Sequence, residues 1–182
     1  MLKSLSFTAV SLSVLTLAVA AQTVQPAQDT ACNVTLPNGI AAVSPEPEQS
    51  FGGTPLSPEG SHGNRMLSTG PFGLWKDGTI VFRPGGAGFV TSEGALGMKF
   101  GWTRGVPGKL KISGRRLDGE APPLRAQVND GYGDLGFQAT ALIFSTPGCW
   151  EVRAQVGDRA DSQLTFVTKV VKIGDGPAWR RD

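Results

Sequence analysis

Large apolar side chains alternate with small or charged ones over Leu96-Gly97-Met98-Lys99-Phe100-Gly101-Trp102. Because successive side chains of a β-strand point to opposite faces of the sheet, this period of two predicts a half-buried strand. Long stretches with the 3.6-residue period of an amphipathic helix are missing from the chain. The segment therefore predicts a sheet that packs one face against a core.

Comparable segments follow and precede it, separated by turns rich in Gly and Pro. The chain has 25 Gly and 13 Pro in 182 residues, which is typical of short strands joined by turns. An Asp-Gly turn at Lys76-Asp77-Gly78 predicts a hairpin over Phe72 to Arg83. About eight strands are expected, and they predict an all-β fold, an antiparallel immunoglobulin-like β-sandwich, with a small barrel as the alternative. The other expected strands are residues 89–91, 109–113, 124–128, 139–144, 149–156 and 163–173.

The amino terminus has the pattern of a secretory signal peptide over residues 1–21. Lys3 precedes an apolar stretch, and Ala18-Val19-Ala20-Ala21 supplies the small residues of a cleavage site. The alternative is an uncleaved anchor, for which the stretch is short. We therefore expect a secreted or periplasmic (cell envelope) protein that meets the membrane only through this leader.

Composition divides the remaining chain into three parts. Residues 22–60 form a Pro/Gly/Ser-rich arm that is expected to be flexible unless it docks. Residues 61–174 carry the strand patterns and form the domain, and residues 175–182 are a polar tail.

Two cysteines in an exported chain predict one disulfide, Cys32 to Cys149. The bridge would attach the arm to a late strand, and the long loop it closes would stabilise the fold by about 4–5 kcal/mol. Two separate thiols are the alternative. One His and two distant Cys lack the close ligand spacing of a zinc site, so neither a metal nor a cofactor is expected.

The charge pattern argues against nucleic-acid binding. The formal net charge is +2, and residues 22–60 contain acidic side chains but no Lys or Arg. The chain has no stretch in which basic and aromatic residues alternate, as expected of a nucleic-acid site.

His62 is the single histidine and the one candidate for acid–base or nucleophilic chemistry. A Gly-x-Ser-x-Gly nucleophile motif is not present, and a loop histidine bonded to the backbone is the alternative. Gly131-Tyr132-Gly133-Asp134-Leu135-Gly136 matches a dinucleotide motif, but the residues after it have a strand pattern where the motif needs a helix. These glycines are instead expected to serve turns.

Two groups of residues are candidates for binding. Trp75 and Trp102 would offer a stacking surface for a sugar, or else belong to the core. Arg115 and Arg116 would hold the carboxylate or phosphate of a ligand, or else pair with an aspartate and join neighbouring loops. The full set of binding candidates is Trp75, Trp102, Arg115, Arg116, Asp118, Tyr132 and Asp134.

The segment Phe144-Ser145-Thr146-Pro147-Gly148-Cys149-Trp150-Glu151-Val152 resembles the start of a late strand in exported bacterial immunoglobulin-like sandwiches. Four more segments resemble a set of uncharacterised bacterial exported immunoglobulin-like β-sandwich proteins. They are residues 32–39, 62–64, 114–118 and 132–138. The resemblance implies the fold and export, and it implies no activity.

These patterns favour an exported, non-enzymatic immunoglobulin-like domain with a binding or structural role in the cell envelope. Its partner would be an envelope protein or a glycan. One alternative is a small-ligand or glycan-binding module that uses an exposed Trp and the Tyr132 loop. The other is a hydrolase that uses His62.

Overall fold

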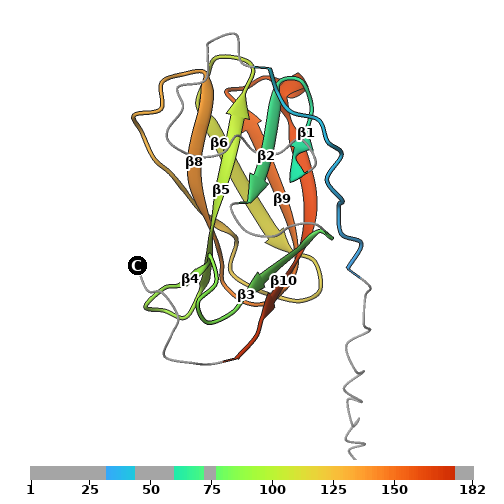
Figure 1. Ribbon diagram of the computed structural model, residues 1–182, viewed down its shortest axis with the longest axis vertical. Helices are drawn as coiled ribbons and strands as arrows, with labels where there is room; N and C mark the ends of the chain where they lie inside the picture. The colour runs from blue at the N-terminus through green and yellow to red at the C-terminus, as the bar shows by residue number, and fades with distance from the viewer. Residues whose placement is uncertain (1–31, 44–59, 72–76, 175–182) are drawn as a thin grey trace, which may run out of the picture.

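Figure 1 shows the computed structural model, which describes residues 32–43, 60–71 and 77–174. Two β-sheets lie face to face, and one short 3-10 turn, η2 (Ala160–Ser162), precedes the last strand. The strands are β1 (His62–Gly63), β2 (Leu67–Pro71), β3 (Thr79–Phe82), β4 (Phe89–Val90), β5 (Leu96–Arg104), β6 (Leu110–Arg116), β7 (Arg125–Val128), β8 (Gly136–Phe144), β9 (Gly148–Val156) and β10 (Leu164–Lys172).

The strand order is that of an immunoglobulin-like sandwich. The first sheet runs β1-β2-β5-β8-β7, with β4 also paired to β5, and the second runs β3-β10-β9-β6. The sets β2-β5-β8-β7 and β6-β9-β10 correspond to the two sheets of the immunoglobulin fold. The predicted sandwich is confirmed, and the barrel alternative is wrong because the sheets do not close on each other.

One strand pair departs from the antiparallel expectation. β3 pairs with β10 in parallel, with Thr79 opposite Lys169. Figure 1 shows why: β2 and β3 point the same way, so the chain changes sheets without reversing. The first half of the expected hairpin, Phe72 to Trp75, lies outside the described residues, and the second half pairs with β10.

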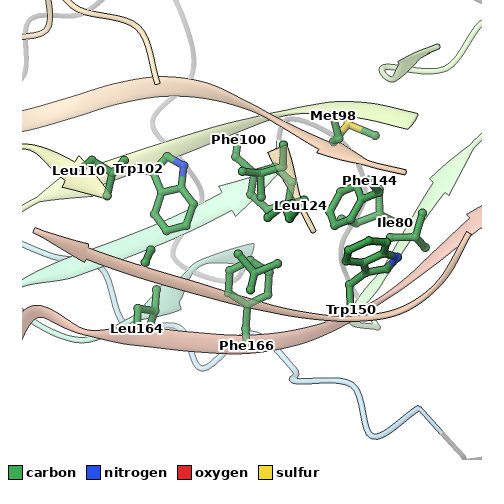
Figure 2. Packing of buried hydrophobic residues seen from close by; sticks show 14 of the residues in the cluster. Ile80, Met98, Phe100, Trp102, Leu110, Leu124, Phe144, Trp150, Leu164 and Phe166 are labelled. Atoms are coloured by element: carbon green, nitrogen blue, oxygen red, sulfur yellow. The ribbon is translucent and has the colours of Figure 1, made fainter. Parts of the chain in front are cut away.

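The core lies between the sheets and follows the predicted alternation. Phe100 and Trp102 from β5 face Phe166 from β10, and Figure 2 shows these rings pointing toward one another. The Phe100 and Phe166 ring centroids are 6.1 Å apart. The buried indole N–H of Trp102 donates to Thr140 Oγ1 at 2.9 Å, so the ring's polar group is satisfied inside the core.

The arm docks on the domain over residues 32–43. Cys32 is bonded to Cys149 on β9, as the sequence predicted. Thr35 donates its N–H to Val167 O at 2.8 Å and accepts from Val167 N–H through its hydroxyl at 2.9 Å. Val167 lies on β10 just before the stretch that pairs with β3. The arm therefore covers a strand edge that would otherwise stay unpaired.

Further along, the arm reaches the first sheet. The Asn38 side chain donates to Gly63 O at 2.8 Å and accepts from Gly63 N–H at 3.0 Å. Ala42 N–H donates to Ser68 Oγ at 2.9 Å. Figure 1 shows this segment beside β1, so the arm connects the margins of both sheets and residues 32–43 belong to the folded domain.

Replacing both Cys32 and Cys149 by Ser is expected to lower the free energy of unfolding by about 4–5 kcal/mol, because the bridge closes a loop with a sequence separation of 117 residues. Urea unfolding measures the change. Thr35→Val is the matched control, since it removes one hydrogen bond and should cost about 1 kcal/mol. Equal stability of the parent and the double variant would contradict the account.

Candidate functional site

Two of the predicted site residues, Tyr132 and Asp134, lie at one end of the sandwich, where the β5 arrow points in Figure 1. The loops after β5 and after β7 surround a cavity of about 380 Å³, which we call the loop-end hollow. Its lining mixes charged, polar and apolar side chains. It consists of Arg104, Lys109, Leu110, Val128, Asn129, Asp130, Gly131, Tyr132, Gly133, Asp134 and Gln138.

Arg104 holds the two loops together from inside. Its side chain continues the inward alternation of β5, and the residue is 1% exposed. One terminal nitrogen donates to Gly108 O at 2.9 Å, and the other donates to Tyr132 O at 3.1 Å and Leu135 O at 3.3 Å. These carbonyls come from both loops, so one guanidinium fixes their separation.

Electrostatics at Arg104 are unusual for a sandwich core. Burial lowers the pKa of the guanidinium, and the nearby Asp134 carboxylate offsets only part of that shift. The three hydrogen bonds from its terminal nitrogens go to backbone carbonyl oxygens. A buried charge that relies on carbonyl dipoles is costly unless every donor is used.

Two polar atoms at this place lack a hydrogen-bond partner among the described residues, namely Arg104 Nε and Gln138 Oε1. Gln138 is 6% exposed, and its amide nitrogen donates to Asn129 O at 2.9 Å. The register places Arg104 opposite Gly136 and Trp102 opposite Gln138. Arg104 and Gln138 are therefore diagonal neighbours on the inner face, within reach of each other for long side chains.

Tyr132 and Asp134 do lie together, on the loop between β7 and β8. The Tyr132 ring meets Phe137 edge to face, with centroids 6.2 Å apart. Gly108 N–H donates to Asp134 O at 2.9 Å, which joins the two loops a second time. Gly131 and Gly133 have φ of 94° and 63°, so these glycines serve the turn as expected.

The arginine candidates lie elsewhere. Arg115 and Arg116 end β6, whereas Leu110 at its start lines the hollow, about 20 Å away along the strand. Arg116 Nε pairs with Asp118 Oδ1 at 2.7 Å, and Arg115 Nε pairs with Glu151 Oε1 at 3.0 Å. Burial opposes ionisation of Asp118, but hydrogen bonding to Arg116 helps to lower the pKa of that carboxyl. This group joins neighbouring segments and is separate from the hollow.

Of the two tryptophan candidates, the structure describes Trp102 alone. Trp102 is fully buried in the core, so its assignment as a binding residue is wrong. Trp102 is buried because its position in the alternation along β5 places it on the inward face, together with Phe100. Trp75 lies outside the described residues.

His62 lies on β1, between the arm and β10. Its ring meets Phe166 at a centroid distance of 6.4 Å. Desolvation lowers its pKa, and hydrogen bonds with the backbone of Leu36 and Thr165 oppose that shift. The register leads from His62 across β2 and β5 to Gln138, a backbone separation of about 14 Å.

The sequence argument missed Arg104 and Gln138. Arg104 is the next residue on the inward-facing side of β5, after the alternating apolar residues Leu96, Met98, Phe100 and Trp102. A charged residue at an inward-facing position is a usable signal of a buried functional group. Gln138 carries no such signal, because only the β5–β8 register reveals its neighbour.

Within the described ranges, no three His, Cys, Asp or Glu side chains are placed to hold a metal ion. A search of the same ranges finds no helix long and apolar enough to cross a membrane. No protein-family model matches the chain, and a search of curated proteins finds no match.

Arg104→Met is expected to lower the free energy of unfolding by about 3 kcal/mol, because three part-buried carbonyls lose their donors. Denaturant unfolding checks it. Lys109→Met, an exposed change in the same lining, should stay within about 0.5 kcal/mol of the parent. An Arg104→Met variant as stable as the parent would refute the role assigned to this side chain.

Stability should fall as the pH drops below 6.5, the ordinary pKa of histidine. The pKa of His62 is lower in the folded chain than in the unfolded chain. The unfolded chain therefore binds more protons in this pH range, and acidification stabilises it relative to the folded chain. Thermal unfolding between pH 7.5 and about 5.5 measures the slope. His62→Gln should flatten it, and since His62 is the chain's single histidine, an unchanged slope would contradict the assignment.

Proposed function

We propose that the chain is an exported, non-enzymatic immunoglobulin-like domain that binds a component of the cell envelope through its loop-end hollow. The single observation that carries the proposal is the buried guanidinium of Arg104, which holds two loops around this hollow in one arrangement. Rigid loops on a sandwich scaffold are the usual carriers of binding.

A purely structural role accounts less well for the polar residues at this end. Core packing alone does not call for a charge at the end of the inward alternation, because burying a charge carries a desolvation cost. Instead the inward alternation ends in a cation, with Gln138 beside it. Departures from local folding rules of this kind tend to occur at functional sites.

Export is supported by two independent features. The sequence begins with the pattern of a secretory leader, and the structure contains the Cys32–Cys149 bridge. Disulfides of this kind persist in oxidising compartments such as the periplasm.

The position of His62 favours binding over hydrolysis. An acid–base mechanism needs its groups within hydrogen-bond reach or one bridging water. His62 lies three strands from Gln138, which lines the hollow together with Asp130 and Asp134, and its ring packs against Phe166.

The test expresses the full chain in a bacterium and follows the mature domain through cell fractionation. We expect cleavage after residue 21, an oxidised cysteine pair, and co-sedimentation of the purified domain with isolated cell envelopes. The double variant Asp130→Ala/Tyr132→Ala should lose most co-sedimentation, since both residues line the hollow.

Arg115→Ala is the matched control, because this exposed residue lies at the opposite end of β6. It should sediment like the parent. A parent domain that stays in the supernatant, or a double variant that sediments equally well, would overturn the proposal.

A further inference from the structure

We propose that the loop-end hollow binds a neutral saccharide, with one sugar hydroxyl placed between Arg104 Nε and Gln138 Oε1. This inference rests on the proposed binding function and specifies the chemical class of the ligand. It uses two residues that are each more than nine-tenths buried and that line the same cavity.

The two unsatisfied atoms require different halves of a hydrogen bond. Arg104 Nε carries a proton and needs an acceptor, whereas Gln138 Oε1 needs a donor. A hydroxyl supplies both, because its oxygen accepts while its proton is donated. Leaving both atoms unpaired inside the protein is costly, so a group that satisfies them together gains that free energy on binding.

Charged ligands fit the lining poorly. A carboxylate or phosphate would satisfy Arg104 but would face Gln138 Oε1 and the carboxylates of Asp130 and Asp134. An ammonium group would suit those oxygens but would meet Arg104 and Lys109. The formal charges of the lining balance, which favours a neutral ligand.

The rest of the lining suits a sugar ring. Leu110, Val128 and the Tyr132 side chain supply apolar surface, and Asn129 supplies an amide. The volume of about 380 Å³ lies in the range of small-ligand sites. Arg104 Nε and Gln138 Oε1 are shielded from bulk water in this structure, so a small side-chain rearrangement accompanies binding.

A second depression, of about 230 Å³, lies on the outer face of β6 and β9 and includes Lys111 and Arg153. Neither unpartnered atom described above belongs to its lining. The two unpartnered atoms therefore belong to the loop-end hollow and not to this depression.

The experiment titrates the ¹⁵N-labelled mature domain with four neutral sugars: glucose, galactose, mannose and N-acetylglucosamine. Glucuronate and glucosamine serve as charged counterparts. We expect at least one neutral sugar to shift the Gln138 side-chain amide and the Arg104 Nε–H signals saturably. The charged counterparts should bind at least about tenfold more weakly.

Gln138→Glu is the decisive variant, because its carboxylate would accept from Arg104 and take the place of the hydroxyl. It should weaken sugar binding at least about tenfold. Gln127→Glu makes the same chemical change on exposed β7, outside the lining, and should bind like the parent. Melting temperatures of both variants confirm that they fold.

Three results would overturn the inference. The first is that no neutral sugar gives a saturable shift, as when water alone fills the site. The second is that a charged counterpart binds more tightly than the neutral sugars, and the third is that Gln138→Glu leaves sugar binding unchanged.

If envelope co-sedimentation nevertheless depends on Asp130 and Tyr132, the proposed function stands and only the saccharide is wrong. If sugars bind but the parent does not co-sediment, the envelope role fails and the saccharide site stands.

Discussion

A positive charge buried at the mouth of a β-sandwich needs compensation from whatever surrounds it. Arg104 obtains it from Gly108, Tyr132 and Leu135, whose carbonyl oxygens belong to the two loops that close this end. The loops in turn depend on the guanidinium, because without it those part-buried oxygens would lose their donor. This mutual dependence gives the loop-end hollow one defined shape, and the binding proposals follow from that shape.

The rest of the fold sets up this arrangement. The nine-residue register between β5 and β8 places Arg104 beside Gln138 at the end of the inner face. On another margin of the sandwich, the arm covers the β10 edge through Thr35 and reaches Gly63 through Asn38. The bridge to Cys149 holds the start of the arm in place, so the scaffold behind the hollow is closed by covalent and backbone bonds.

Local patterns in the sequence predict some of this and miss the rest for a physical reason. Alternation over Leu96 to Trp102 indicates which face is buried, and the two cysteines indicate their own pairing. Neither pattern specifies which strand lies next to which. The parallel β3–β10 pair, the docking of the arm and the diagonal placement of Arg104 and Gln138 all depend on residues far apart in the chain. Trp102 illustrates the limit, since its residue type permits stacking on a sugar while its phase on β5 places it in the core.

Hydrogen exchange at the Gly108 amide tests most directly whether the two loops form one rigid unit. This N–H donates to Asp134 O at 2.9 Å and joins the loop after β5 to the loop after β7. If Arg104 holds both loops in place, the amide exchanges far more slowly than in an unfolded peptide, and Arg104→Met accelerates it sharply. Exchange of the Gly108 amide in the parent chain at the rate of an unfolded peptide would contradict the account.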